Sequence, residues 1–287
     1  MIIITGSKSF IGKSLVAYLK KKKEKIFKID INEKNSTVSK KVNFRSKNIS
    51  KFIKKNSTLI HLAAVSNDRD GKKNPELAFS VNVNGTLNLL ESCRKKRIKH
   101  FIFASTEWVY DKSKNNKNSE NDEIDITSMT SEYAISKIVC EQMIKNYSKF
   151  FKITILRFGI IYANRRGIGS AIESIVDKIK NKEKLKIGSL NTSRNFIHID
   201  DIISGIYASV KSKKSDIYNL AGNQNISLGK IIKISSKILN VNAKIQELNK
   251  NKSSIRIVEN KKAIKYLNWK PKINIHEGIK KIVFNSN

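Results

Sequence analysis

The sequence predicts an α/β protein built on a parallel sheet with helices on both faces. Residues 1 to about 159 alternate between short apolar runs and amphipathic stretches, the pattern of parallel strands joined by helical crossovers. The first apolar run leads directly into a glycine-punctuated loop and a helix, and ligands of such sheets lie at the carboxyl ends of the strands. With 287 residues and 39% hydrophobic content, the chain can bury a substantial core.

The chain begins with a strand, a tight turn and a helix. Residues 1–5 form an apolar run that suits a buried strand, and residues 13–20 form an amphipathic helix after the loop. Gly6 permits the turn, and Gly12 lets the helix pack close to the strand. Ser9 stands where a middle glycine is expected. Because a helix N-terminus presents amides and a partial positive charge, the loop predicts a site for a dinucleotide pyrophosphate.

The second strand, residues 25–30, ends in Asp30. An acid about 20 residues beyond such a loop can hold a ribose 2′-hydroxyl and repel a 2′-phosphate. Asp30 therefore favours NAD over NADP, although the residue alone would also fit a strand-end cap.

Tyr133 and Lys137 form a Tyr-x-x-x-Lys pattern at the start of a further predicted helix, residues 134–145. Residues four apart share a helix face, so the ammonium is expected beneath the phenol. A nearby cation favours the phenolate and lowers the pKa of the tyrosine towards the working pH, as a general base for an alcohol requires. The same spacing also occurs on solvated helix faces, and the preceding loop and Asp30 are what favour catalysis.

Further segments occur in the order and spacing of a known family. They are His61-Leu-Ala-Ala64, Asn82-Val-Asn-Gly-Thr86, Phe101-Ile-Phe-Ala-Ser-Thr106, Leu156-Arg-Phe-Gly159, Arg194-Asn-Phe-Ile-His-Ile-Asp-Asp201 and Leu267-Asn-Trp-Lys-Pro271. With the opening loop, they make the chain resemble, nearly from end to end, an extended short-chain dehydrogenase/reductase of the NAD-dependent epimerase/dehydratase family, which modifies nucleotide sugars.

This resemblance implies a Rossmann-type doubly wound parallel sheet with a smaller, discontinuous C-terminal substrate domain. Residues 1–159 and about 194–221 would form the NAD-binding domain, and about 160–193 and 222–287 the substrate domain. The polar stretch 111–129 is expected to be a loop near the mouth of the site or an inert surface insertion.

The resemblance also implies roles for individual residues. Thr106 would hydrogen-bond the sugar hydroxyl, Tyr133 would exchange its proton, and Lys137 would hold the nicotinamide ribose, while NAD performs the hydride chemistry. The implied cofactor-binding residues are Gly6, Ser9, Phe10, Ile11, Gly12, Asp30, Leu62, Ala63, Ala64, Asn82, Tyr133, Lys137 and Phe158. The implied substrate-binding residues are Ser66, Thr106, Glu107, Trp108 and Arg194, of which Arg194 would clamp the diphosphate. No metal site is implied.

Several positions depart from the family's pattern and leave the reaction open. Family dehydratases carry an acid two places after the catalytic threonine, where this chain has Trp108. Glu107 lies one place early, and one residue of shift reverses a strand side chain, so Glu107 can act as the base only if the strand has ended. Trp108 could stack against the substrate or anchor the core or a lid. Ile160 replaces a diphosphate-binding asparagine of 4-epimerases, and only Lys250 and Lys252 lie where a second arginine is expected.

We therefore expect an NAD-dependent nucleotide-sugar epimerase that transiently oxidises a sugar hydroxyl at C4. The alternatives within the family are a nucleotide-sugar 4,6-dehydratase and a keto-sugar reductase. The alternative of another class is a non-catalytic NAD-binding regulator, although such a protein has no need of Thr106, Tyr133 and Lys137 together.

The formal net charge of +33 raises the question of nucleic acid or anionic membranes. The lysines are scattered along the chain, and no basic tail or interleaved aromatic set accompanies them, so we interpret the charge as compositional bias. Positive potential would still attract a diphosphate sugar. No apolar run reaches the ~20 residues of a membrane span, no secretory leader precedes the first strand, and two cysteines make no disulfide framework. A cytoplasmic homodimer is expected.

Overall fold

A computed structural model describes residues 1–110, 117–127, 129–165 and 169–284. The chain divides into two compact units. Unit 1 comprises Met1–Lys112, Glu123–Arg157 and Gly205–Tyr218, and unit 2 comprises Ser113–Asp122, Phe158–Ser204 and Asn219–Asn287. Residues 194–204, which we expected to return to the NAD-binding domain, cluster with unit 2 instead. The polar loop expected at 111–129 lies outside the described residues at positions 111–116 and 128.

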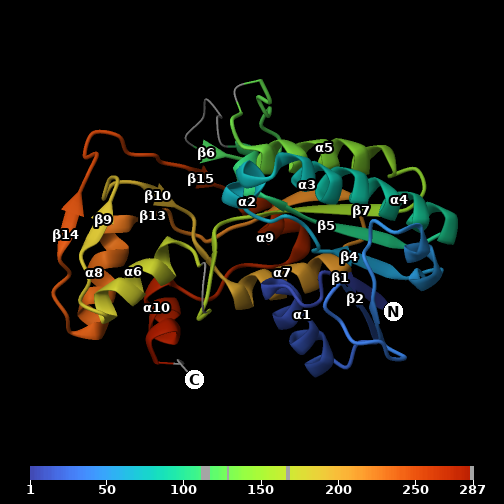
Figure 1. Cartoon of the computed structure of the whole chain (residues 1–287), viewed down its shortest axis with the longest axis horizontal. Helices are drawn as coiled ribbons and strands as arrows, with labels where there is room; N and C mark the ends of the chain where they lie inside the picture. The colour runs from blue at the N-terminus through green and yellow to red at the C-terminus, as the bar shows by residue number, and fades with distance from the viewer. Residues whose placement is uncertain (111–116, 128, 166–168, 285–287) are drawn as a thin grey trace. The chain divides into compact units, whose positions relative to one another are not determined.

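Unit 1 is organised around a seven-stranded sheet with the strand order β12-β7-β5-β4-β1-β2-β3 (Figure 1). The strands are β1 (Ile2–Thr5), β2 (Ile26–Asp30), β3 (Ser39–Lys41), β4 (Thr58–His61), β5 (His100–Thr106), β7 (Lys152–Phe158) and β12 (Asp216–Leu220). The interior strand β1 pairs in parallel with both β2 and β4. The pairs β2–β3 and β4–β5 are also parallel.

The strand order places a topological switch point between β1 and β4. The chain runs outward from β1 through β2 to β3, then returns to β4 and runs outward the other way. In doubly wound sheets, ligands bind in the crevice beyond the carboxyl ends of the strands at such a reversal. The predicted doubly wound Rossmann-type sheet is confirmed, and its switch point directs attention to the loops after β1 and β4.

Helices cover both faces of this sheet (Figure 1). The helical elements of this part are α1 (Phe10–Lys21), η1 (Lys47–Phe52), α2 (Asp68–Lys73), α3 (Pro75–Phe79), the π-helix η2 (Ser80–Asn84), α4 (Gly85–Lys96), η3 (Glu107–Tyr110) and α5 (Glu132–Asn146). Helix α7 (Ile199–Val210) begins in unit 2 and ends in unit 1. Strand and helix side chains such as Ile3, Leu59, Leu89 and Phe101 share one buried hydrophobic cluster. The predicted helix at 134–145 lies within α5, which begins where the Ser131 hydroxyl accepts a hydrogen bond from the Ala134 amide.

Unit 2 combines helices with short two-stranded pairs. Its remaining helices are α6 (Ala171–Lys180), α8 (Leu228–Leu239), α9 (Lys261–Leu267) and α10 (Ile275–Phe284). The strand pairs are β8 (Ile161–Tyr162) with β11 (Ile197–His198), β9 (Leu185–Ile187) with β14 (Ile245–Glu247), β10 (Ser193–Arg194) with β13 (Ile226–Ser227), and β6 (Lys117–Asn118) with β15 (Ile257–Val258). Its own hydrophobic cluster includes Tyr162, Ile175, Ile231 and Ile279.

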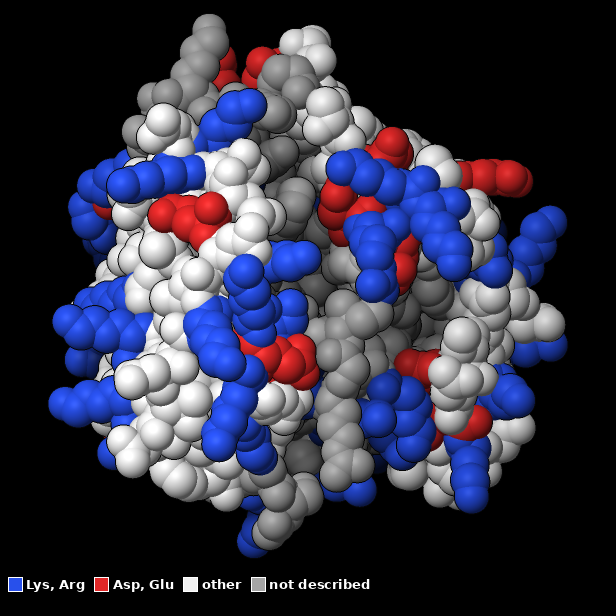
Figure 2. All heavy atoms as spheres, turned by 60° about the vertical axis from the view of Figure 1, so that its left-hand side comes forward, with Lys and Arg blue, Asp and Glu red and all other residues white. Residues whose placement is uncertain are grey.

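The excess of basic residues is spread over the surface that Figure 2 shows, with acidic side chains between the lysines and arginines. Among the described helices, none has the length and apolarity needed to cross a membrane. Cys93 and Cys140 are both buried and unbridged. The homodimer, the cytoplasmic location and the absence of a nucleic-acid partner stay predictions.

Candidate active site

Thr106 and Tyr133 meet at the carboxyl end of β5. Thr106 is the last residue of that strand, and Tyr133 lies in the first turn of α5. The Oγ1 atom of Thr106 accepts a hydrogen bond from the Trp108 amide at 3.2 Å, so its own proton can be directed towards the Tyr133 phenol. A strand end and a helix start therefore hold the two hydroxyls next to each other. The catalytic roles expected of Thr106 and Tyr133 stay predictions.

Burial dominates the acidity of Tyr133. The side chain is buried, and burial raises the pKa of Tyr133 to about 12, while the hydrogen bond with Thr106 lowers it. The direction is opposite to the one that we expected from the spacing to Lys137. Removal of the phenol from water costs the phenolate more than the Thr106 hydrogen bond returns to it.

Lys137 is also buried, and its ammonium is directed at the strand. Its Nζ atom donates to the carbonyl oxygen of Ala104 at 2.8 Å and lies 4.6 Å from the ring centre of Phe103. Burial lowers the pKa of Lys137 to about 8, while Cys140 and Glu141 raise it. At neutral pH the group is therefore cationic, but its charge is poised near the edge of the physiological range.

A buried ion-pair network lies next to this lysine, and we did not predict it. Glu141, one helical turn beyond Lys137, accepts bonds from Arg157 Nη2 at 2.7 Å and Nε at 3.1 Å. The Ser105 hydroxyl donates to Glu141 at 2.5 Å, and Arg157 Nη1 donates to the Tyr110 hydroxyl at 2.7 Å. The network ties α5, β5, β7 and η3 together. The i to i+4 spacing from Lys137 was the signal that could have indicated Glu141.

The loop after β1 has the geometry that its glycines predict. Gly6 has a φ of +74°, and a Cβ there would lie 2.6 Å from the Ala63 amide nitrogen, so the turn after β1 packs against the segment after β4. Gly12 has no room for a side chain because a Cβ would collide with the Gly6 carbonyl oxygen. The Ser9 hydroxyl accepts from the Gly12 amide at 3.1 Å and caps α1. Ser9 thus replaces the middle glycine with a helix cap.

The other predicted cofactor residues line the same edge of the sheet. Phe10 and Ile11 begin α1, and Leu62, Ala63 and Ala64 follow β4, all half-buried. Asn82 is buried in η2, where its amide oxygen accepts from the Val65 amide at 2.9 Å and its amide nitrogen donates to the Ser136 hydroxyl at 2.9 Å. Asn82 therefore fixes the segment after β4 to helix α5.

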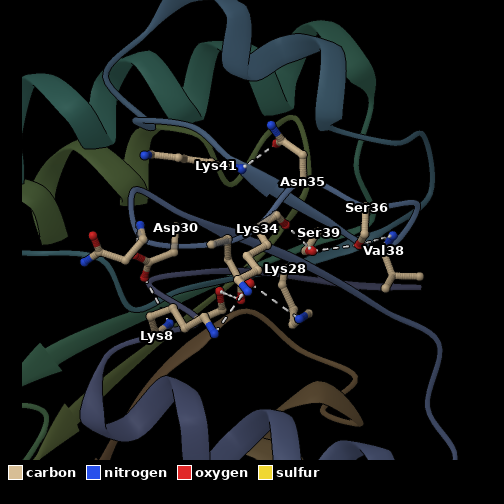
Figure 3. Close-up of polar contacts among 12 residues, drawn as sticks. Lys8, Lys28, Asp30, Lys34, Asn35, Ser36, Val38, Ser39 and Lys41 are labelled. Carbon is tan, nitrogen blue, oxygen red and sulfur yellow. Dashed lines mark hydrogen bonds and ion pairs between the residues drawn. The ribbon is translucent and has the colours of Figure 1, made fainter.

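Asp30 ends β2 beside the glycine loop. Its carboxylate accepts from the Lys8 amide at 3.0 Å and from the Asn32 amide at 2.9 Å. Figure 3 shows Asp30 next to Lys8, with lysines from β2, from the segment after it and from β3 in the same region. The acid is thus held at the position where the sequence predicted a contact with a ribose, and its role there stays a prediction.

The predicted substrate residues are less well assembled. Glu107 is buried and begins η3, half-buried Trp108 follows it, and Ser66 is exposed after β4. Phe158, which was predicted to bind the cofactor, is the buried last residue of β7. Arg194 belongs to unit 2, where its guanidinium donates to the Ser254 carbonyl at 2.7 Å and hydroxyl at 2.9 Å. The diphosphate clamp expected of Arg194 stays a prediction.

Gly71 is a further residue that the sequence did not single out. It lies in α2, and a Cβ at this position would stand 3.2 Å from the Tyr133 backbone nitrogen and 3.3 Å from the Tyr133 Cβ. An added side chain at residue 71 would therefore press against the first turn of α5, which would have to shift slightly. A lone glycine in a short polar helix offered no sequence signal for this contact.

Comparison with known proteins shows the family to which the chain is similar. The family described as "NAD dependent epimerase/dehydratase family" matches residues 2–221. A UDP-glucuronate 4-epimerase of Thermodesulfobacterium geofontis is 32% identical over 79% of this chain and 71% of its own length. A protein of Methanocaldococcus jannaschii assigned by inference as a UDP-glucose 4-epimerase is 30% identical over 99% of this chain and 97% of its own. A UDP-glucuronic acid 4-epimerase from Bacillus cereus, solved with NAD, is 25% identical with a TM-score of 0.85, covering 98% of this chain and 94% of that one.

Proposed function

Because this chain belongs to the NAD dependent epimerase/dehydratase family, we propose that it epimerises a nucleotide-diphosphate sugar through transient oxidation of a sugar hydroxyl. The observation that carries this proposal is the hydrogen-bonded pair of Thr106 and Tyr133, with the ammonium of Lys137 on the same helix. The pair lies at the carboxyl end of β5, on the side of the sheet where the glycine loop and Asp30 also lie.

The residues around the glycine loop fit a dinucleotide. Tight packing of Gly6 against Ala63 and the capped start of α1 leave a backbone loop at the switch point, which is the arrangement that accepts a pyrophosphate. Asp30 would hold the adenosine ribose, and Lys137 the nicotinamide ribose. When bound, NAD supplies the acceptor for the substrate hydride and returns that hydride later.

Tyr133 would move the proton. It takes the proton of the sugar hydroxyl as the carbon is oxidised and returns it when the carbonyl is reduced again. The Thr106 hydroxyl donates to the phenolate and stabilises it, against the burial that raises the pKa of Tyr133 to about 12. Lys137 would add a positive charge on the same face of α5, one helical turn from Tyr133.

A UDP-sugar with reaction at C4 is the substrate that we propose. Both sequence relatives and the solved structure described above carry the name of a UDP-sugar 4-epimerase. Turnover of the ketone in the site, followed by hydride return to its opposite face, would invert C4 and regenerate NAD.

A 4,6-dehydratase is the second candidate, and Glu107 favours it. Strand β5 ends at Thr106, and Glu107 already belongs to the helical turn η3. Family dehydratases carry an acid at the position of Trp108, and Glu107 could take its role only if the strand had ended. Because β5 ends at Thr106, side chains no longer alternate between faces at Glu107, and this condition is met. Glu107 is also buried, as a carboxylate that must accept a proton from carbon is expected to be.

The test is to incubate the purified protein with NAD and a panel of uridine, thymidine, guanosine and cytidine diphosphate sugars. An isomer of unchanged mass supports the epimerase, loss of water supports the dehydratase, and turnover only with added reduced cofactor supports a reductase. Tyr133→Phe should lose at least ~100-fold in kcat, whereas Tyr266→Phe, a change at a surface tyrosine that is 59% exposed, should keep full activity. Activity that survives Tyr133→Phe would refute the proposed base.

A further inference from the structure

Glu33 is an acidic residue at the glycine loop that the proposed chemistry does not use. It follows β2 by three residues, and only 5% of it is exposed. Its Oε1 atom accepts a hydrogen bond from the Ser7 hydroxyl at 2.9 Å. Its Oε2 atom lies 3.5 Å from the Lys28 ammonium and 3.8 Å from the Lys8 ammonium. Carboxylates are rarely buried without such partners, so these contacts hold the Glu33 side chain in its position.

The Glu33 cluster adjoins Asp30 directly. Lys8 donates its amide to the Asp30 carboxylate while its side chain reaches Glu33. Lys28 and Asp30 are two residues apart on β2, so they project from the same face of the strand. Figure 3 shows Lys8, Lys28 and Asp30 at this end of the sheet. Two carboxylates, those of Asp30 and Glu33, therefore balance two ammonium groups where a dinucleotide is expected to place its adenosine ribose.

Without Glu33 this region would favour an added phosphate. A phosphate monoester carries about −1.5 to −2 charges, and lysines are common phosphate ligands. The side chains of Lys8 and Lys28 are 41% and 19% exposed, so both are accessible to a ligand. Lys41 stands opposite Asp30 on β3, and Lys34 follows Glu33 directly, so further positive charge surrounds the site. Asp30 alone does not offset the two ammonium groups of Lys8 and Lys28 that Glu33 contacts.

We propose that Glu33 is a second determinant of cofactor choice. By holding the ammonium groups of Lys8 and Lys28, Glu33 denies the 2′-phosphate of NADP its cationic partners and adds a negative charge beside it. The chain is thereby selective for NAD despite a net charge of +33. This inference rests on the proposed function only in that the glycine loop binds a dinucleotide.

The test compares the dissociation constants of NAD and NADP for the full chain and its Glu33→Gln variant by calorimetry. Glutamine keeps the size of the side chain and can still accept from Ser7, but it lacks the charge. NADP should bind at least ~10-fold more tightly to Glu33→Gln than to the wild type, while NAD affinity changes less than ~3-fold. The gain in NADP affinity should shrink as salt rises, because partly exposed charges cause it.

Glu76→Gln is the matched control, since it changes the net charge equally at an exposed position on α3. It should leave both dissociation constants unchanged. A folded Glu33→Gln protein that binds NAD normally and shows the wild-type NADP to NAD ratio would overturn the role of Glu33 while leaving dinucleotide binding intact. A wild-type protein that binds neither dinucleotide would overturn the proposed function as well.

Lys28→Met provides the second variant if Glu33→Gln fails to fold. It retains the Glu33 carboxylate and removes one of its cationic partners, so the charge facing a 2′-phosphate becomes more negative. NADP should then compete with NAD less well than in the wild type. NADP that competes equally well or better would contradict the proposal.

Discussion

Replacing Glu141 by glutamine would leave a buried guanidinium without its counter-charge. The side chains of Glu141 and Arg157 are 1% and 2% exposed, and two hydrogen bonds of 2.7 and 3.1 Å join them. Ser105 and Tyr110 fill further positions of the same network. We therefore expect this change to destabilise unit 1 far more than the loss of a surface ion pair would.

The expected cost is about 3–5 kcal/mol of unfolding free energy, because removing one partner of a buried pair leaves the other charge uncompensated. Arg157→Met should cost a similar amount. The double variant Glu141→Leu/Arg157→Met should recover most of this loss, since apolar side chains that replace a buried pair together are often neutral or stabilising. A natural domain has only ~5–15 kcal/mol in total, so each single change should be readily measurable.

Urea unfolding of unit 1 can be followed through Trp108, because the other tryptophan, Trp269, lies in unit 2. A Trp269→Phe background makes the tryptophan fluorescence specific to unit 1. If the dependence of the unfolding free energy on urea concentration is the same in all variants, a shift of the midpoint reports a change of stability. Lys72→Met, which breaks the exposed Asp68–Lys72 pair, is the control and should cost less than ~1 kcal/mol. The reasoning fails if both single changes cost less than ~1 kcal/mol, or if the double variant loses the sum of the two.

Three further predictions concern the same elements. Burial lowers the pKa of Lys137 to about 8 and Glu141 raises it, so activity that needs the ammonium should fall above about pH 8. In a pH–kcat profile of Glu141→Gln this fall should begin at lower pH, and a profile identical to that of the wild type would contradict the expectation. Gly6→Ala places a Cβ on a residue with a φ of +74° and 2.6 Å from a backbone nitrogen, so it should abolish NAD binding in calorimetry. Gly188→Ala, which adds a Cβ with no atom within 4 Å, should bind NAD normally. Burial lowers the pKa of His100 to about 3, so below pH 6.5 the unfolded state binds more protons than the folded state. The free energy of unfolding should therefore fall by about 2 kcal/mol from pH 6.5 to 5. The urea midpoint of His100→Asn should depend less on pH in this range.

The parts of the fold that were predictable from sequence are those that local patterns determine. The apolar run before Gly6 suited a buried strand, and the pattern from residue 134 to 145 predicted the helix that α5 contains. The doubly wound order then followed from alternating strands and helices, because crossovers between parallel strands have one hand. The expected domain boundary near residue 194 differs from the division into compact units, because Arg194 lies in β10, which pairs with β13, and bonds Ser254. No local sequence pattern indicates these contacts.

The electrostatics of the site could not be predicted in the same way. Spacing shows that Tyr133 and Lys137 share a face of α5, but it does not show how deeply the neighbouring elements bury that face. The structure buries both groups, raises the pKa of the tyrosine and directs the ammonium to the Ala104 carbonyl. Desolvation is a property of the whole packed unit, so it outweighs a pairwise attraction that the sequence can suggest.

The orientation of Glu107 could not be predicted from the sequence, because it depends on where strand β5 ends. On a continuing strand, Glu107 and Thr106 would point to opposite faces of the sheet. Glu107 could then not replace the acid that dehydratases carry at position 108, and the tryptophan there would argue against a dehydratase. Because β5 ends at Thr106 and a helical turn follows, the strand rule does not apply to Glu107. Under the proposed function, the choice between returning the hydride to the same carbon and eliminating water first would depend on this buried carboxylate. Glu107→Gln should leave an epimerase able to turn over but stop a dehydratase at the oxidised sugar, and product masses distinguish the two.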